Sequence, residues 1–319
     1  MPSILCGIPS FDIAFTSSPY AKQHIQSLVS ELNDLGYDTS FFHGAPNGSM
    51  GFLGFANILG FDHYYGKEEF GDDSQFDGVW GIWDEPFFNY MGKVLSQKQQ
   101  PFMATLFSTS SHHPFHIPRQ YEGKFDKGKL PIHQTVGYTD FALRSFFNTI
   151  RDKPWFEKTL FVITADHTNQ IGYNEYKKPI NRFAVPIIFY TPKGALSGED
   201  MRLAQQIDIY PTILNIIGSE KPFFSLGESL LNSDSKPFVI THNGNIFYGL
   251  SEQYICVFDG QKALGFYDIN DKGLQTNLIE IRSQDMTRLE NFCKAFVQNY
   301  MNRIVERRLY YNPQKPQLN

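Results

Sequence analysis

An aspartate and a histidine stand side by side just after the clearest strand that the sequence predicts. That strand covers residues 159–164, and Asp166 and His167 follow it. Because open parallel sheets bind ligands beyond the carboxyl ends of their strands, both side chains could turn into a cleft there. A carboxylate and an imidazole suit Mn²⁺ or Zn²⁺ as ligands. The competing interpretation, which an isolated pair favours, is that Asp166 caps a turn and His167 is a structural histidine.

Histidines also follow two other predicted strands. The loop after strand 101–107 contains His112, His113 and His116. Near neutral pH an imidazole can bind an anionic oxygen or protonate a leaving group, which makes His112 and His113 candidates for either task. Three loop histidines can equally be a solvated surface, and the residues alone give the two interpretations similar weight. His43, at the end of the first clear strand, is a weaker member of the same set.

Alternating helices and strands would position these side chains. Apolar residues at helical spacing predict helices over residues 21–35, 84–96, 135–151 and 204–217. Short apolar runs predict strands over residues 39–42, 101–107, 159–164 and 185–190. Such alternation implies an α/β fold with a mainly parallel sheet and helices on both faces. The long loop over residues 109–131 is of the kind that is usually functional.

The pattern changes after about residue 233. Strands are predicted over residues 237–241, 254–258 and 264–267 without helices between them, as in an antiparallel sheet. A helix over residues 283–308 then carries one apolar stripe, which indicates core packing. We therefore predict a catalytic core over residues 1–232 and a small carboxy-terminal α+β subdomain over residues 233–319.

Charge and composition exclude several classes of protein. The net charge is -5 and no long run of Lys or Arg occurs, so nucleic-acid binding is not expected. The three cysteines, Cys6, Cys256 and Cys293, lie far apart and indicate neither a paired-cysteine metal motif nor a disulfide framework. No window approaches the roughly 18 apolar residues of a membrane span, and the chain opens on an apolar segment without a leader.

Six short motifs resemble one family. In order they are HG at 43–44, GFDHYY at 60–65, WGIWD at 80–84, SHHPF at 111–115, TADHT at 164–168 and QIDIYPTIL at 206–214. Their order and spacing are similar to those of the lipoteichoic acid synthase-like phosphoglycerol transferases of the sulfatase and alkaline phosphatase superfamily. The resemblance spans nearly the whole chain. It implies a three-layer α/β/α sandwich of the alkaline phosphatase/sulfatase type, with a small carboxy-terminal antiparallel sheet plus helix.

The resemblance also implies roles for individual residues. Asp166 and His167 would ligate a catalytic divalent metal, with Mn²⁺ as the expected ion. His112 would contact the phosphoglycerol group, with His113 beside it in the substrate-binding loop. His43 matches a further active-site histidine, so His43 and His112 are the catalytic candidates. Asp208 is expected to cap and anchor a helix rather than to perform chemistry.

The implied reaction is phospho-group transfer. A metal-activated Thr or Ser would attack a phosphodiester, form a covalent phosphoglycerol-enzyme intermediate and pass the group to a glycan hydroxyl or to water. The donor would be an anionic glycolipid or a phospholipid headgroup, and the acceptor a cell-envelope glycan. The family implies the extracytoplasmic face of the membrane or the periplasm, with membrane association only through a region ahead of Met1.

Two departures from the family pattern stand out. The nucleophile and a first acidic ligand are expected before Met1, so neither Ser3 nor any other Ser or Thr receives the nucleophile role. Ala45, Met50 and Phe52 occupy a stretch where the Gram-positive synthases carry polar or basic residues that touch substrate. This argues against the polymerase activity of those synthases and leaves open a related branch, such as periplasmic phosphoglycerol or phosphoethanolamine transfer.

Two other functions stay open. One is a non-catalytic glycan-binding remnant of the same fold. The other is a sulfuric ester hydrolase, but those enzymes need a Cys or Ser within a Cys/Ser-x-Pro-x-Arg pattern, and Cys6 is followed by Gly-Ile-Pro-Ser. Phosphate chemistry is therefore preferred.

Overall fold

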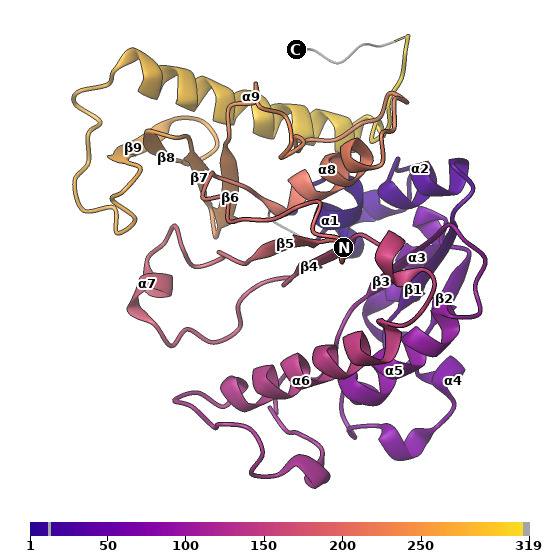
Figure 1. The fold of residues 1–319 in the computed structure, drawn as a ribbon. Helices are drawn as coiled ribbons and strands as arrows, with labels where there is room; N and C mark the ends of the chain where they lie inside the picture. The colour runs from indigo at the N-terminus through magenta and orange to yellow at the C-terminus, as the bar shows by residue number, and fades with distance from the viewer. Residues whose placement is uncertain (12–13, 315–319) are drawn as a thin grey trace. The chain divides into compact units, whose positions relative to one another are not determined.

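The computed structural model describes residues 1–11 and 14–314. The chain divides into two compact units: unit 1 comprises Met1–Leu28, Ala165–Val185 and Gly198–Asn319, and unit 2 comprises Val29–Thr164 and Pro186–Ser197. In the colours of Figure 1, unit 1 therefore takes both ends of the chain and unit 2 its middle. This division differs from the predicted boundary at residue 232, which stays a prediction.

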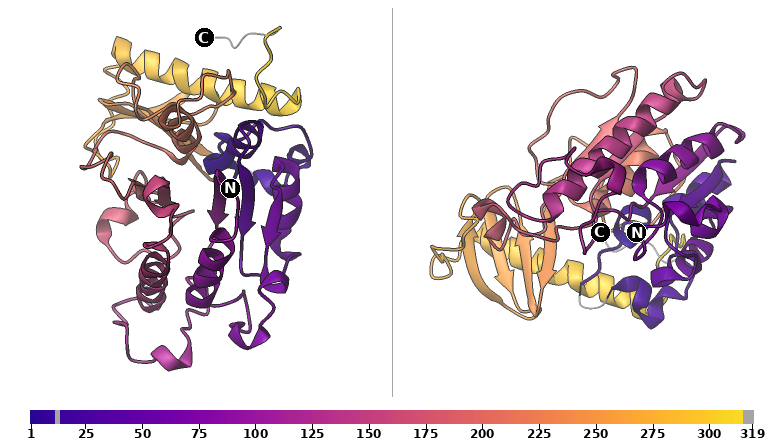
Figure 2. Two further views of the ribbon diagram at one scale, coloured as in Figure 1. Left: turned by 45° about the vertical axis from the view of Figure 1, so that its right-hand side comes forward. Right: turned by 90° about the horizontal axis from the view of Figure 1, so that it is seen from below.

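Unit 2 contains a three-stranded parallel sheet. Strands β1 (Asp38–Phe42), β2 (His63–Tyr65) and β3 (Phe102–Leu106) lie in the order β2-β1-β3, visible in the left view of Figure 2. Phe42, the last residue of β1, pairs with Tyr65 on one side and Leu106 on the other. The predicted parallel arrangement is confirmed for β1 and β3, and β2 is an additional parallel strand.

Helices cover both faces of this sheet because β1 buries alternate side chains on opposite sides. Phe41 packs against Phe52, the first residue of α3 (Phe52–Leu59), and against Phe61. Phe42 joins the core formed with α5 (Asp84–Leu95) and α6 (Ile132–Ile150). Unit 2 therefore has the predicted three layers.

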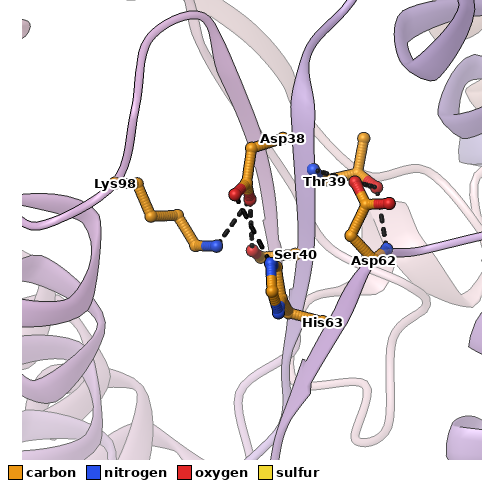
Figure 3. A network of polar contacts seen from close by, with 6 residues as sticks. All are labelled: Asp38, Thr39, Ser40, Asp62, His63 and Lys98. Carbon is orange, nitrogen blue, oxygen red and sulfur yellow. Dashed lines mark hydrogen bonds and ion pairs between the residues drawn. The ribbon is translucent and has the colours of Figure 1, made fainter.

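A polar network fixes the amino-terminal edge of the sheet (Figure 3). Asp38 contacts Lys98 Nζ at 2.5 Å and His63 Nε2 at 3.4 Å. Asp62 accepts hydrogen bonds from the backbone N–H and the hydroxyl of Thr39, at 2.9 and 3.0 Å. These contacts lock β1 and β2 in register at the edge opposite to the one from which His43 emerges.

Two strands of unit 2 depart from the prediction. β4 (Phe161–Thr164) pairs with β5 (Ile187–Tyr190) in antiparallel fashion, and the two form a separate two-stranded sheet. The prediction that residues 159–164 and 185–190 form strands of the parallel sheet is therefore wrong. A parallel pair needs a long crossover, usually helical, whereas α7 (Asn174–Lys177), the helix between these strands, has a single turn.

Unit 1 contains an antiparallel sheet of four strands in chain order: β6 (Val239–Asn243), β7 (Ile246–Leu250), β8 (Tyr254–Phe258) and β9 (Ala263–Asp268). Helix α9 (Gln284–Val305) lies along this sheet (Figure 1). Cys293 and Phe296 of α9 share a core with Phe258 and Phe266 of the strands. The small carboxy-terminal antiparallel sheet plus helix is confirmed, with β7 as an additional strand.

Several helices are shorter than predicted. The helix expected over residues 21–35 is α2 (Leu28–Asp34), because Gln26 donates its backbone N–H to the Leu309 carbonyl at 2.8 Å instead of joining a helix. The helix expected over residues 204–217 opens as a 3₁₀ turn and continues as α8 (Ile209–Ile216), against which α1 (Pro2–Cys6) packs.

One short helix, α4 (Lys67–Phe70), completes the set of α-helices over the described ranges 1–11 and 14–314. Within those ranges, no helix combines the length and apolar character needed to cross a bilayer.

Candidate functional site

The carboxyl edge of the parallel sheet brings two predicted residues together. β1 and β3 are parallel neighbours, so the segments that follow them leave the sheet at the same edge. His43 follows β1 and donates its backbone N–H to the Tyr65 carbonyl at 2.9 Å. Phe107 follows β3 and donates its N–H to the Phe42 carbonyl at 2.9 Å. This bond extends the ladder to the start of the loop with His112, His113 and His116, which we call the histidine loop.

His43 is buried, with 4% of its surface exposed, and its ring packs against Phe52 and Phe107. Its Nδ1 lies 3.0 Å from the Phe107 carbonyl oxygen. Because a carbonyl can only accept, Nδ1 carries the hydrogen and Nε2 keeps a lone pair. Burial lowers the pKa of His43, the Phe107 carbonyl opposes this, and the nearby His112 lowers it further. The ring is therefore neutral at pH 7.

His112 is oriented in the same way. Its Nδ1 lies 3.0 Å from the Thr109 carbonyl oxygen, so Nδ1 donates and Nε2 is left for another partner. The ring lies 4.9 Å from the Trp80 ring, centroid to centroid, at an angle of 34°. His113 is exposed and its ring meets the edge of Phe115. Two imidazoles beyond this edge of the sheet, those of His43 and His112, are thus oriented through Nδ1, and we call them the histidine pair.

Asp166 and His167 follow β4 as predicted, and they belong to unit 1. His167 Nε2 lies 3.3 Å from Asp166 Oδ2, and both side chains are exposed, at 57% and 43% respectively. His167 Nδ1 lies 2.9 Å from the Thr168 carbonyl oxygen, which makes Nδ1 the donor. Gln206 supports the turn by donating to the carbonyls of Ala165 and Asp166 at 2.7 and 2.9 Å.

The donor atoms of Asp166 and His167 fit a divalent metal as two of its ligands. Nε2 of His167 faces a carboxylate oxygen of Asp166. The Thr168 carbonyl orients the His167 ring through Nδ1, and a backbone carbonyl is a usual hydrogen-bond partner of a metal-bound histidine. Over residues 1–11 and 14–314, no group of three or more His, Cys, Asp and Glu side chains could hold an ion. Since a site takes about four donors, further ligands are required.

Asp208 has the predicted structural role. Its carboxylate accepts backbone hydrogen bonds from Gln205 at 2.8 Å and Glu228 at 3.0 Å, and its carbonyl accepts from the Thr212 hydroxyl inside α8. Burial is the main cause that raises the pKa of Asp208 to about 6. The residue anchors the 3₁₀ turn that opens α8, whereas its side chain does not cap α8 itself, so the anchoring part of the prediction is confirmed.

Sequence reasoning gave no role to the segment 80–84, although its motif was noted. In the structure this segment contacts the histidine loop through Trp80, Ile82 and Asp84. One signal was available, because an aspartate directly before an apolar helical pattern is typical of a helix start that can bind backbone N–H groups.

Comparisons with known proteins agree with this architecture. A family model described as "Sulfatase" matches residues 1–219. Lipoteichoic acid synthase-like YvgJ of Bacillus subtilis is 24% identical over 73% of this chain and 41% of its own length. Phosphoglycerol transferase I of Citrobacter koseri is 28% identical over 83% of this chain and 36% of its own length. The chain thus spans well under half of these curated relatives.

Solved structures share the fold. A protein in the alkaline phosphatase superfamily from Vibrio parahaemolyticus superposes with a TM-score of 0.80 at 22% identity, over 95% of this chain and 75% of the other. The lipoteichoic acid synthase LtaP from Listeria monocytogenes gives a TM-score of 0.76 at 21% identity, over 95% and 78% of the two chains. With the family model matched over most of its length, the chain belongs to the sulfatase family and has the alkaline phosphatase superfamily fold.

Proposed function

We propose that this chain forms part of a metal-dependent phosphoglycerol transferase or hydrolase that acts on cell-envelope glycans or glycolipids. The observation that carries the proposal is the histidine pair: two imidazoles at one sheet edge, each tied through Nδ1 to a backbone carbonyl, each with Nε2 left for a ligand. Oriented imidazoles suit the binding and proton transfers of phosphate ester chemistry.

In this proposal one histidine of the pair accepts a hydrogen bond and the other donates a proton. His43 is neutral and accepts a hydrogen bond from a substrate hydroxyl at Nε2. As the attacking hydroxyl oxygen bonds to phosphorus and the bond from phosphorus to the departing oxygen breaks, a protonated His112 donates from Nε2, so its proton ends on the leaving alcohol. His113, which is exposed, would contact substrate at the rim.

We assign the divalent metal, with Mn²⁺ as the expected ion, to Asp166 and His167. Once bound, such an ion neutralises negative charge that develops on the phosphate oxygens. The carbonyl of Thr168 holds the His167 ring in the tautomer that offers Nε2, and Gln206 holds the backbone of the turn. Both residues therefore limit how the ligands move.

The proposed partners are an anionic glycolipid or a phospholipid headgroup as donor and a glycan as acceptor, on the extracytoplasmic face of the membrane or in the periplasm. The names of the relatives in Bacillus subtilis and Citrobacter koseri support this choice. The apolar side chain of Phe52, whose ring lies 4.7 Å from the His43 ring, supports a branch that differs from the Gram-positive synthases.

A sulfuric ester hydrolase is the second candidate, because the matching family model is described as "Sulfatase". The two functions differ in substrate. The native full-length protein with Mn²⁺ should release labelled glycerol phosphate from phosphatidylglycerol faster than it cleaves an aryl sulfate. Faster sulfate cleavage would overturn the preference, and no cleavage of either ester would favour a glycan-binding remnant.

Variants test the residues. We expect His112→Gln and Asp166→Asn each to lower kcat by 10²-fold or more, since proton transfer and charge stabilisation are each worth about that much. His116→Gln is the matched control, because His116 is an exposed histidine of the same loop that is not assigned to the site. Full activity in His112→Gln would remove His112 from the mechanism.

A further inference from the structure

The carboxylate of Asp84 is buried directly beneath the histidine loop. The residue is 1% exposed and begins helix α5. Its Oδ1 accepts hydrogen bonds from the backbone N–H groups of Thr109 and Ser110, at 3.0 and 3.2 Å, and its Oδ2 accepts from the Thr139 hydroxyl at 2.8 Å. In return the Ser110 hydroxyl accepts from the Asp84 N–H at 3.0 Å. Such a fully bonded buried carboxylate fixes the backbone that it touches.

The anchored backbone is the one that orients His112. The N–H of Thr109 is held by Asp84, and the carbonyl of Thr109 accepts the Nδ1 hydrogen of His112. Thr109 and Ser110 are themselves buried, at 4% exposure each, so water does not replace these bonds. The position of the Thr109 carbonyl, and with it the His112 tautomer, therefore depends on Asp84.

The rest of the segment 80–84 meets the same loop. The Ile82 carbonyl accepts from the Thr109 hydroxyl at 3.1 Å. The Trp80 ring packs on the His112 ring, and its indole N–H donates to the His113 carbonyl. Three alternate residues of this segment thus contact the loop. Asp84 and Ile82 bind its start at Thr109 and Ser110, and Trp80 contacts His112 and His113.

This segment also contacts the backbone next to His43. The Ile82 N–H donates to the Gly44 carbonyl at 2.8 Å. Gly81 lies so close that a Cβ there would be 2.7 Å from the Gly44 oxygen. No side chain fits between the two backbones, so the segment 80–84 connects the two members of the histidine pair.

We propose that Asp84 is a positioning residue, which holds the Thr109 carbonyl so that His112 keeps its hydrogen on Nδ1 and presents Nε2 to the substrate. The part of this inference that concerns activity rests on the proposed function, whereas the part that concerns the imidazole does not. Asp84 itself touches neither substrate nor metal in this scheme.

The test is a ¹⁵N NMR spectrum of the histidine side chains, nine of which lie in this sequence. Full-length protein with ¹⁵N-labelled histidine is compared with Asp84→Ala and Asp84→Asn, and His112→Gln assigns the signal. In the parent protein and in Asp84→Asn, which keeps Oδ1, we expect the neutral form of His112 to carry its hydrogen on Nδ1. In Asp84→Ala we expect a mixture of tautomers and a loss in kcat of about 100-fold at little changed KM, as for a displacement of about 1 Å.

Met91→Ala is the control for general loosening, because Met91 is a core residue of the same helix α5. It should lower the melting temperature and leave the His112 signal as it was. If Asp84→Ala fails to fold, the double variant Asp84→Asn with Thr139→Val, which leaves the second side-chain group of residue 84 without the Thr139 hydroxyl, must show a partly shifted tautomer.

An unchanged His112 tautomer in folded Asp84→Ala, or a shift as large in Met91→Ala, overturns the inference. A shifted tautomer with unchanged kcat keeps Asp84 as the positioning residue and removes His112 from the proposed reaction, so the two failures are distinguishable.

Discussion

Asp208 makes the stability of unit 1 depend on pH in a direction opposite to the usual one for carboxylates. Burial raises its pKa from 3.8 to about 6 in the folded protein, more than the backbone N–H groups of Glu228 and Gln205 lower it. The folded state therefore binds this proton more tightly than the unfolded state does. Its contribution to stability is complete below pH 3.8 and is lost as pH rises through about 6.

The difference of roughly two pH units corresponds to about 3 kcal/mol, at about 1.4 kcal/mol per unit. Asp208→Asn cannot ionise, so it removes the effect. We would measure urea unfolding by circular dichroism at pH 4, 5, 6 and 7 for both proteins. The free energy of unfolding of the parent protein should fall relative to Asp208→Asn by about 3 kcal/mol over this range. A difference that is constant, or that grows with pH, would refute the reasoning.

Three further predictions concern single residues. Gly249→Ala places a Cβ 2.1 Å from the Cys293 sulfur and should destabilise the protein by about 1–3 kcal/mol in thermal unfolding, less so in a Cys293→Ala background. Asp62→Ala leaves the Thr39 N–H without its acceptor and should lower the free energy of unfolding by about 1–3 kcal/mol. Tryptophan fluorescence can follow the unfolding, because all three Trp residues of this sequence lie in unit 2. The pKa of His43 is lowered from 6.5 in the folded protein, so the free energy of unfolding should fall as pH drops below 6.5. Tryptophan fluorescence can follow this unfolding too, and His43→Gln should abolish this pH dependence.

Sequence-based prediction was most accurate for elements whose position depends on the local spacing of apolar residues. The apolar run before His43 and the amphipathic pattern from Asp84 match β1 and α5 closely. The neighbours Asp166 and His167 also fall where expected, just after β4. In each case the residue lies at the end of a strand or at the start of a helix, which periodicity locates well.

Pairing between distant segments was not predictable in the same way. Residues 185–190 read as a strand, but periodicity does not say which partner or direction that strand will take, and β5 runs antiparallel to β4. The start of α2 was misplaced because Gln26 bonds to Leu309 far along the chain. The role of Asp84 likewise depends on a loop 25 residues away.

One missed strand had a local signal. Asn243 pairs with Ile246, so the two residues between them form a tight hairpin loop, and Gly244 has φ of +64°. A glycine in a two-residue loop between apolar runs is a hairpin signature. Strand β7 was therefore within reach of sequence reasoning.

The sequence separation between contacting residues in unit 2 has a consequence for folding kinetics. The histidine pair, the segment 80–84 and their partners up to Thr139 all lie in unit 2, so their contacts close loops of at most about 70 residues and need no part of unit 1. Unit 1, in contrast, assembles from three separated stretches and includes the final helix α9. During synthesis the histidine pair can therefore form while the surroundings of Asp166 and His167 are still incomplete.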